Sequence, residues 1–322
     1  SCNRNKIRFR IRSYRKSNMK KKILILMGGI SGERNISIMT GKACYKALKK
    51  KGYFVRTLDP KINFIDQLRK KKPHIVFNAL HGRYGEDGFV QSILELEKIK
   101  YTHSGVLASS IAINKVVSKK IFIKNKIATP NYLVYELNSN KNLLTELKKN
   151  KINFPVVIKP ISEGSSLGVY ICTKKNLIKK IKLLKDYKEI LIEKFIPGRE
   201  IQVAIMGKSK LGAIELKPRR KFYDYYAKYY KKSKTKHIMP AVLDQKKYNE
   251  VLNIAKKAHQ ILGCKGISRS DFRFYKNKFY LLEVNTQPGM TNLSLVPEIA
   301  QYKGIKFEDL VDWMIKDASL KR

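Results

Sequence analysis

The chain has 322 residues, long enough for two or three domains with sizeable cores, and its 69 lysines and arginines against 25 acidic residues give a formal net charge of +44. No apolar run approaches the roughly 20 residues of a transmembrane helix, and the four cysteines are scattered without a C-x-x-C pair. We therefore expect a soluble cytoplasmic protein with reduced thiols and no zinc site. The positive charge is spread along the chain and no segment resembles a nucleic-acid-binding module, which argues against specific nucleic-acid recognition.

Residues 1–18 form a basic extension with seven lysines and arginines and no acidic residue. This composition fits a transit peptide. It also fits an extension upstream of a natural start, because Met19 precedes three lysines and a predicted strand. We favour the second interpretation and expect the segment to be disordered, so that deleting it leaves melting temperature and activity unchanged.

The N-terminal part, residues 19–113, alternates apolar strand-like runs with helical patterns. The first run ends in Gly28-Gly29, which indicates a buried strand entering a tight loop. The predicted elements are strands at 23–27, 53–58 and 75–80 with a helix after each, the first helix at 36–51. This alternation predicts a small parallel sheet of α/β type.

The rest of the chain divides into a central part, residues 114–209, and a C-terminal part, residues 210–322. The central part mixes strands and helices around a Gly/Ser loop at 164–168. Backbone N–H groups in such a loop can cradle phosphate oxygens, although no G-K-[S/T] sequence makes it a P-loop. The C-terminal part has its clearest helix at 244–262, with Asp244 as the predicted N-cap. The Tyr- and Lys-rich run at 223–236 is the expected mobile loop.

A predicted hairpin at 266–285 carries the clearest chemical signal. Glu283 and Asn285 lie two residues apart at the end of its second strand, so both project to one face, and Arg269 shares a face with Asp271 in the first strand. Carboxylate and amide oxygens suit Mg²⁺, which binds through one or two carboxylates plus substrate phosphates. Arg269 and Asp271 are also compatible with a plain surface ion pair, but the hairpin predicts a metal site for phosphoryl transfer.

The chain resembles the D-alanine–D-alanine ligases, a family of the ATP-grasp superfamily. The E-x-N strand alone is typical of ATP-grasp enzymes, and the segments H-G-x-x-G-E-D-G at 81–88 and Y-D-Y-x-A-K-Y at 223–229 narrow the resemblance to the ligase. The other matching segments are 28–34, 159–168, 193–200 and 294–297. The resemblance runs from about Met19 to about Ile315. It implies an α/β (α+β) ATP-grasp fold, with an N-terminal parallel-sheet domain followed by a two-part ATP-grasp module.

The resemblance also implies a set of nucleotide ligands. Three lysines would hold phosphates, a hinge after a strand would read adenine, and a glutamate would bind the ribose hydroxyls. The phosphate ligands are Lys115, Lys159 and Lys228, the hinge residues are Glu193, Lys194, Phe195 and Ile196, and the ribose ligand is Glu200. Two Mg²⁺ ions, with Mn²⁺ as an alternative, would be held by Asp271, Glu283 and Asn285. For any single lysine in so lysine-rich a chain, a solvated surface position is the plain alternative.

The resemblance also implies which residues bind the two amino-acid substrates. Glu33 would hold the ammonium of the first D-alanine, and His81 would face the same substrate. Ser165 and Tyr229 resemble a pair that hydrogen-bonds with Glu33 and fastens the mobile loop over the site. The remaining implied residues are Arg269 and Gly289 for oxyanion charge, and Ser294 and Leu295 for the carboxylate of the second D-alanine.

The implied activity is ATP-dependent ligation of two D-alanines through a D-alanyl phosphate, for peptidoglycan precursor synthesis in the cytoplasm. The resemblance also implies a homodimer. Ser268, Ser270 and Gln287 depart from the usual family pattern without removing an implied ligand. Two alternatives stay open: another ATP-grasp carboxylate–amine ligase with a different acceptor, and a basic nucleic-acid-binding protein on an α/β scaffold.

Overall fold

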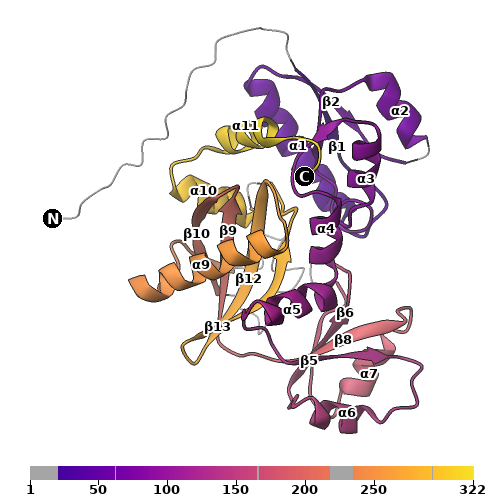
Figure 1. Cartoon of the computed structure of the whole chain (residues 1–322), viewed down its shortest axis with the longest axis vertical. Coiled ribbons are helices and arrows are strands. Elements are labelled where there is room, and N and C mark those ends of the chain that lie inside the picture. Colours follow the sequence, from indigo (N-terminus) through magenta and orange to yellow (C-terminus); the bar gives the residue numbers. More distant parts are fainter. Residues whose placement is uncertain (1–20, 62, 165–166, 218–234, 292) are drawn as a thin grey trace, which may run out of the picture.

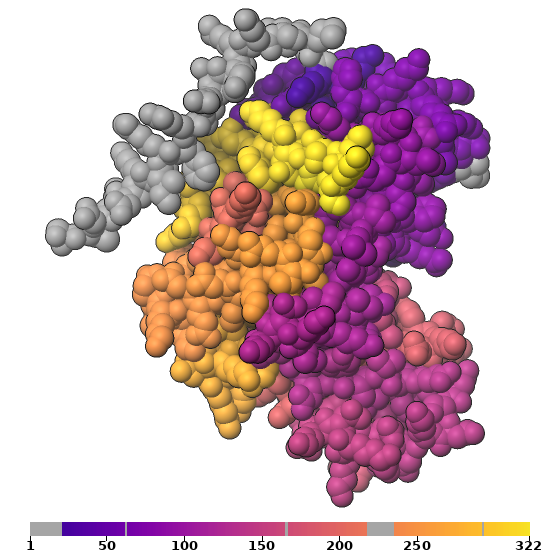
Figure 2. Space-filling model, viewed as in Figure 1, coloured from indigo at the N-terminus to yellow at the C-terminus, as the bar shows by residue number. Residues whose placement is uncertain are grey.

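Three sheets organise the chain in a computed structural model that describes residues 21–61, 63–164, 167–217, 235–291 and 293–322. The predicted extension, Ser165, Lys228 and Tyr229 lie outside these residues. Figure 1 shows the N-terminal sheet at one end, the central sheet at the other, and the third sheet beside both. In Figure 2 the central part, magenta to salmon, projects as a lobe at the bottom of the view. Within the described residues, no helix is long and apolar enough to cross a membrane.

The N-terminal sheet is parallel, as the alternation of strands and helices predicts. Its order is β2-β1-β3-β4, and each neighbouring pair runs parallel. The strands are β1 (Lys22–Leu26), β2 (Phe54–Leu58), β3 (Ile75–Asn78) and β4 (Lys100–Tyr101), and the helices are α1 (Arg34–Lys50), α2 (Phe64–Lys71), α3 (Phe89–Leu96) and α4 (Val106–Ile113). Because β1 and β3 are neighbours, the loops that follow them meet at one edge of the sheet, where ligands bind in open α/β sheets.

The central sheet is antiparallel and has an apolar core of its own, to which the helices at 143–149 and 177–182 contribute. Its order is β5-β8-β6-β7. The elements are α5 (Lys115–Lys124), β5 (Tyr132–Glu136), α6 (Leu143–Lys149), β6 (Val156–Pro160), β7 (Tyr170–Cys172), α7 (Leu177–Lys182) and β8 (Glu189–Lys194). β6 is buried along its whole length, which accounts for its uninterrupted apolar sequence before Lys159.

The third sheet is antiparallel and carries the predicted hairpin at one edge. Its order is β11-β10-β9-β12-β13. The elements are β9 (Arg199–Met206), β10 (Ser209–Lys217), β11 (Lys236–Ile238), α9 (Gln245–Ile261), β12 (Ile267–Tyr275), β13 (Lys278–Asn285), α10 (Leu295–Tyr302) and α11 (Phe307–Asp317). Because β9 lies in this sheet, we propose that the two halves of the module divide just after β8 rather than at residue 209.

Local sequence signals explain how two of these elements begin and turn. The Asp244 carboxylate accepts a hydrogen bond from the Lys247 backbone N–H at 2.8 Å, so it caps α9 as predicted. The hairpin between β12 and β13 turns through Lys276 and Asn277, both with positive φ. Two successive positive φ values suit a two-residue hairpin loop, because such a turn follows the twist of the strands.

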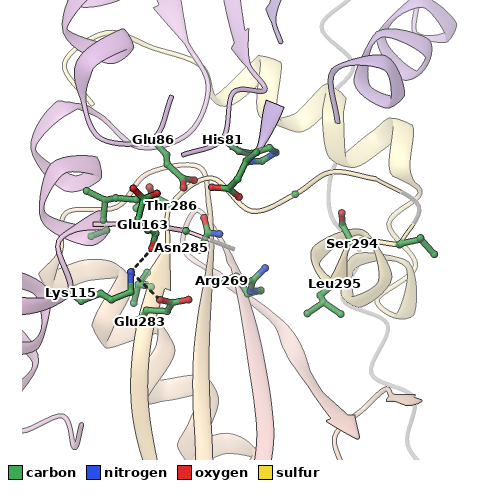
Figure 3. Close-up of a pocket in the computed structure, with 17 residues that line it drawn as sticks. His81, Glu86, Lys115, Glu163, Arg269, Glu283, Asn285, Thr286, Ser294 and Leu295 are labelled. Carbon is green, nitrogen blue, oxygen red and sulfur yellow. Dashed lines mark hydrogen bonds and ion pairs between the residues drawn. The ribbon is translucent and has the colours of Figure 1, made fainter. Parts of the chain in front are cut away.

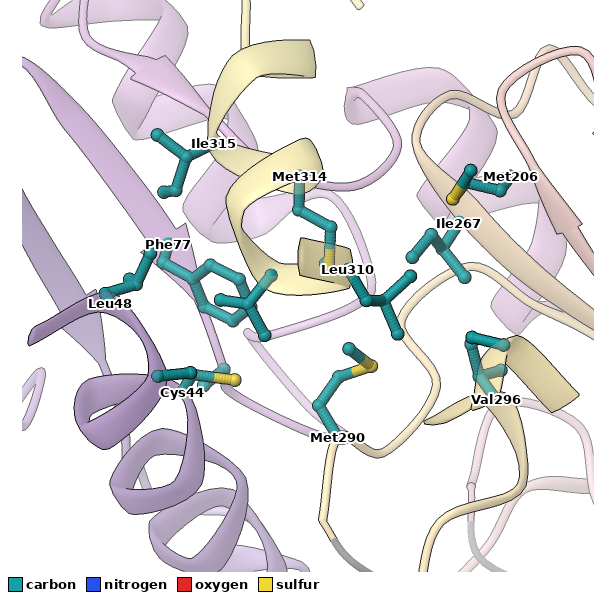
Figure 4. Close-up of a cluster of buried hydrophobic side chains, with 14 of the residues drawn as sticks. Cys44, Leu48, Phe77, Met206, Ile267, Met290, Val296, Leu310, Met314 and Ile315 are labelled. Atoms are coloured by element: carbon teal, nitrogen blue, oxygen red, sulfur yellow. The ribbon is translucent and has the colours of Figure 1, made fainter. Parts of the chain in front are cut away.

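A shared apolar core joins the N-terminal sheet to the third sheet. Helix α11 packs on α1 and β3 on one side and reaches β9 and β12 on the other, as Figure 4 shows. The buried side chains labelled there are Cys44, Leu48, Phe77, Met206, Ile267, Met290, Val296, Leu310, Met314 and Ile315. The Tyr53 hydroxyl adds a polar link by donating to Asp312 at 2.6 Å. This core fixes the loops after β1 and β3 above the hairpin.

Candidate active site

The hairpin places four polar side chains in a square on one face of the sheet. Arg269 lies opposite Asn285, and Asp271 lies opposite Glu283. Directly opposed residues of an antiparallel pair share a face, and residues two apart in one strand share it as well. The structure therefore brings Arg269, Asp271, Glu283 and Asn285 together as the sequence predicts.

The donor set of this square fits a magnesium ion. Within the described residues, no group of three His, Cys, Asp or Glu side chains is arranged to hold a metal. The square offers two carboxylates and one amide instead, and Mg²⁺ takes its remaining ligands from water and substrate phosphates. Each carboxylate already faces a cation. Asp271 accepts from Arg269 Nε at 2.7 Å and Nη2 at 2.9 Å, and Glu283 lies 3.8 Å from Lys115 Nζ.

A pocket beside the square gathers the residues expected to bind the nucleotide. It lies between the central sheet and the third sheet, and Asp271 and Glu283 form part of its wall. The predicted nucleotide ligands that line it are Lys115, Lys159, Glu193, Lys194, Phe195, Ile196 and Glu200. Lys228, the remaining predicted phosphate ligand, lies outside the described residues.

The Glu193 carboxylate is the centre of a buried ion-pair cluster. It contacts Lys159 Nζ at 2.6 Å and Lys119 Nζ at 2.9 Å, and all three side chains are buried. Burial alone would raise the pKa of Glu193, but the two lysines outweigh it and the pKa is lowered. Burial lowers the pKa of Lys119 to about 8, against the opposing effect of Glu193. Since two lysines engage this carboxylate, we propose that its main task is to hold Lys159 in place.

Lys119 is a site residue that the sequence interpretation missed. It lies four residues after Lys115 on α5, a spacing that puts both side chains on one helical face. The four-residue spacing between Lys115 and Lys119 could have indicated that both lysines face the same site. It does not stand out in the sequence because lysine is so frequent in this chain. Arg273 was missed as well; it pairs with Glu200 at 2.5 Å. The expected ribose ligand is therefore held by an arginine on the neighbouring strand.

The start of helix α5 fixes the position of Lys115. The Asn114 side chain accepts hydrogen bonds from the backbone N–H groups of Val116 and Val117, both at 3.1 Å. Lys115 Nζ donates to the Glu163 carbonyl at 2.5 Å. The N-cap thus orients a lysine that lies between the hairpin and the Gly/Ser loop.

Replacing Asn114 by alanine should lower stability and weaken nucleotide binding. Loss of this cap should lower the free energy of unfolding by about 0.5–2 kcal/mol, and a frayed α5 should raise the KM for ATP. Asn142→Ala is the matched control, because Asn142 caps α6 through Thr145 N–H at 3.1 Å and α6 lines neither pocket. Urea unfolding and steady-state kinetics measure both effects. Equal KM values in the two variants would contradict the role of this cap.

A second pocket gathers the residues expected to bind the amino acids. Its wall comes from the loops after β1 and β3, the hairpin and the start of α10 (Figure 3). The predicted residues that line it are Glu33, His81, Arg269, Glu283, Asn285, Gly289, Ser294 and Leu295, and Glu86, Lys115 and Glu163 join them. Ser165 and Tyr229 lie outside the described residues, so their roles stay predictions.

His81 is a buried neutral imidazole in this second pocket. Its Nε2 lies 3.1 Å from the Thr40 hydroxyl. Burial, together with a smaller effect of the Arg269 charge, lowers the pKa of His81 to about 4. An imidazole with this pKa is uncharged near neutral pH, so His81 can offer a hydrogen bond or shape to the substrate but no positive charge.

The segment that follows β13 carries Gly289, which lines the second pocket, and Gln287. A side chain added at Gly289 would approach the Ser294 hydroxyl to 3.0 Å, so glycine lets the backbone come close to the start of α10. Gln287 departs from the usual family pattern, and its side chain bridges to the end of β3. It donates to the Leu80 carbonyl and accepts from Asn78 Nδ2 at 3.1 Å. This glutamine therefore joins the segment after β13 to the N-terminal sheet.

Three buried imidazoles should make the protein less stable as the pH falls. Burial lowers the pKa of His81 and His259 to about 4 and that of His103 to about 3. Their neutral forms contribute stability above the unfolded pKa of about 6.5, and this contribution is lost as the pH falls towards the folded values. Each should add up to about 1.4 kcal/mol per pH unit to the slope.

Urea unfolding between pH 7 and pH 4.5 measures this slope. His259 lies outside both pockets. The variant His259→Gln should therefore reduce the dependence of the free energy of unfolding on pH by the contribution of one histidine. A free energy of unfolding that does not change over this range would contradict the assignment of neutral buried histidines.

Known proteins resemble this chain over nearly its whole length. Residues 121–316 match the family described as D-ala D-ala ligase C-terminus. The chain is 59% identical over 304 residues to the D-alanine–D-alanine ligase of Pelagibacter ubique (strain HTCC1062), covering 94% of this chain and 100% of that protein. It is 46% identical over 302 residues to the D-alanine–D-alanine ligase of Wolbachia pipientis wMel, covering 92% and 94%.

A solved structure is similar as well. The D-alanine–D-alanine ligase of Bacillus anthracis complexed with ATP matches with a TM-score of 0.80 and 32% sequence identity. The match covers 92% of this chain and 97% of that one.

Proposed function

The chain belongs to the D-alanine–D-alanine ligase family, and from this premise we propose how its own residues join two D-alanine molecules. The protein is an ATP-dependent carboxylate–amine ligase of the ATP-grasp type. Its product, D-alanyl-D-alanine, serves peptidoglycan precursor synthesis, as the family implies.

The shared wall of the two pockets carries this proposal. Lys115, Glu163 and Glu283 line both the nucleotide pocket and the amino-acid pocket. A phosphate at this shared wall would lie between the adenine hinge on one side and Glu33 on the other. This arrangement suits direct transfer of the γ-phosphoryl group to a carboxylate, a reaction that depends on positioning and on stabilising charge.

In the first step, a carboxylate oxygen of the first D-alanine attacks the γ-phosphorus of ATP. The bond from phosphorus to the ADP oxygen breaks, giving D-alanyl phosphate and ADP. Lys159, fixed by Glu193, and Lys115 hold phosphate oxygens, while Glu33 holds the substrate ammonium. Mg²⁺ held by Asp271, Glu283 and Asn285 would neutralise phosphate charge in this step.

In the second step, the neutral amine of the second D-alanine attacks the acyl carbon. A tetrahedral oxyanion forms, its C–O bond to phosphate breaks, the amine nitrogen gives up one proton to the departing phosphate, and inorganic phosphate leaves. Arg269 and the Gly289 N–H stabilise the oxyanion, and the segment at Ser294 and Leu295 receives the acceptor carboxylate. Asp271 fixes the orientation of Arg269 through two hydrogen bonds.

Product analysis with a panel of acceptors tests the proposal. ADP release should depend on D-alanine, and D-alanyl-D-alanine should be the main product near neutral pH when other D-amino acids and D-lactate are supplied. An enzyme that releases ADP but forms another product preferentially would instead be a related ligase with a different acceptor. A homodimer and a cytoplasmic location remain family-based proposals, and analytical ultracentrifugation tests the first.

A further inference from the structure

Gln202 is a buried polar residue in the wall of the nucleotide pocket to which the proposed mechanism gives no task. It lies in the middle of β9 and is only 4% exposed. Within the described residues, no hydrogen-bond donor reaches its Oε1 atom. A buried amide oxygen without a partner costs about 1–3 kcal/mol, so an apolar side chain would suit the fold better. A buried polar group of this kind calls for an explanation, and a ligand supplies one.

The alternation of side chains along β9 shows that this position faces the site. Ile201, Val203 and Ile205 belong to the apolar core that packs against α9. The side chains between them project to the opposite face of the sheet. On that face, Glu200 and Gln202 line the nucleotide pocket. The amide group of Gln202 is therefore buried on the side of the sheet where the nucleotide is expected.

The register of the sheet puts Gln202 in one row with the two carboxylates of the magnesium square. Gln202 lies directly opposite Asp271 on β12, and Asp271 lies opposite Glu283 on β13. Opposed residues of antiparallel strands have their Cβ atoms about 4.5–5.5 Å apart, whereas residues two apart along one strand are separated by about 7 Å. Gln202 is therefore attached to the sheet nearer to Asp271 than to Glu200, the proposed ribose ligand.

An acceptor in this place needs a hydrogen-bond donor from the ligand. The ionised phosphate oxygens of a nucleotide only accept hydrogen bonds, so they do not suit the Gln202 Oε1 atom. A water molecule bound to Mg²⁺ is a donor, and Mg²⁺ usually keeps several waters when it binds through one or two carboxylates and phosphates. A neutral amide also suits an ion that already has two carboxylates, because it adds no charge to the site.

We propose that Gln202 belongs to the magnesium site, where its Oε1 atom accepts a hydrogen bond from a water molecule bound to the ion. This inference rests on the proposed function, because it concerns the ion that Asp271, Glu283 and Asn285 would hold. It extends the metal site across the third sheet, from the hairpin to β9. Gln202 is then a positioning residue, which acts on the ion through its water and not on D-alanine.

The variant Gln202→Leu removes the acceptor and keeps a side chain of similar size. Isothermal titration with ADP, once with Mg²⁺ and once with EDTA, separates metal binding from nucleotide binding. Mg²⁺ should increase the affinity of the parent for ADP. In Gln202→Leu the affinity in EDTA should equal the parental value, whereas the gain in affinity from Mg²⁺ should be about 10- to 100-fold smaller. This is the usual cost of losing a group that supports a metal ligand.

Melting temperatures distinguish this role from a purely structural one. Because its Oε1 atom has no partner in the fold, Gln202→Leu should keep or raise the melting temperature of the protein without ligands. Gln91→Leu is the matched control. Gln91 is buried outside both pockets and donates to the Gly85 carbonyl at 2.9 Å. Its replacement should lower the melting temperature and leave the gain in ADP affinity from Mg²⁺ unchanged.

Three results would overturn the proposal. A lower melting temperature in Gln202→Leu, with equal losses of ADP affinity in Mg²⁺ and in EDTA, would assign Gln202 to the fold. Equal losses without a change in stability, which disappear when 3′-deoxy-ADP replaces ADP, would assign it to a ribose hydroxyl. A variant that gains as much affinity from Mg²⁺ as the parent would leave Gln202 without a role at the metal.

The parent protein separates the two levels of the argument. If Mg²⁺ raises the ADP affinity of the parent and of Gln202→Leu equally, only the role of Gln202 is wrong and the magnesium square stands. If Mg²⁺ does not raise the ADP affinity of the parent, the magnesium square fails and this inference fails with it.

Discussion

Replacing Glu283 by glutamine should reduce the rate of ADP formation by more than about 100-fold. Loss of a residue that merely supports a metal ligand typically costs 10–100-fold in activity, and Glu283 is one of only two carboxylates in the proposed magnesium square. Its charge also faces Lys115 at 3.8 Å on the wall shared by the two pockets. The substitution keeps the side-chain shape. It removes a negative charge that faces the positive charges of Mg²⁺ and Lys115 at the place where the phosphoryl group is transferred.

The fold should survive this change, because the Glu283 side chain is 31% exposed and its neighbours in β13 keep their ladder partners. Lys278→Gln, an exposed charge change at the other end of the same strand, is the matched control and should leave turnover near the parental value. A coupled assay of ADP release at saturating Mg²⁺ measures both. Near-normal turnover in Glu283→Gln would remove this residue from the metal site.

Replacing Glu193 by glutamine should produce the largest loss of stability. Lys119 and Lys159 are buried against this carboxylate, and breaking a buried ion pair by removing one partner costs about 3–5 kcal/mol. The KM for ATP should rise as well, because Lys159 loses the group that holds it towards the phosphates. The difference in free energy of unfolding between Glu193→Gln and the parent should become smaller as the pH rises. In the folded variant, buried lysines without their carboxylate partner lose their protons at a lower pH than in the unfolded chain, so raising the pH favours the folded state.

A second buried glutamate provides the control for this variant. Glu215 is 1% exposed and pairs at 2.7 Å with Arg199, whose side chain is 35% exposed. Glu215→Gln leaves a cation that solvent can reach, so its loss of stability should be smaller and the KM for ATP should not change. Urea unfolding at pH 7 and pH 9 gives the comparison. Equal losses in the two variants would contradict the buried cluster as the cause.

The sequence predicted those parts of the site that depend on strand periodicity. Alternation along β12 and β13 puts Arg269 and Asp271 on one face, and Glu283 and Asn285 on the same face once the hairpin closes. The parallel sheet followed from the spacing of its strands and helices, and the loops after β1 and β3 then had to meet. The hinge and phosphate residues came from the family resemblance, and the structure places those it describes around one pocket.

The parts that the sequence did not predict depend on pairing between distant segments. Lys119 becomes a site residue only because β8 brings Glu193 beneath α5, a contact across 74 positions that no local pattern contains. Glu86 lies within the H-G-x-x-G-E-D-G segment, but its approach to Glu33 requires β1 and β3 to be neighbours. The bridge from Gln287 to Asn78 likewise depends on how the third sheet packs on the first.

The fate of the carboxylate oxygens of D-alanine tests the central claim most directly. With D-alanine labelled by ¹⁸O in its carboxylate, formation and breakdown of D-alanyl phosphate should move one labelled oxygen into inorganic phosphate for each dipeptide formed. The second donor oxygen should remain in the peptide carbonyl. Mass spectrometry of the released phosphate and of the dipeptide measures both. Equal amounts of ADP and dipeptide accompanied by unlabelled phosphate would contradict ligation through an acyl phosphate.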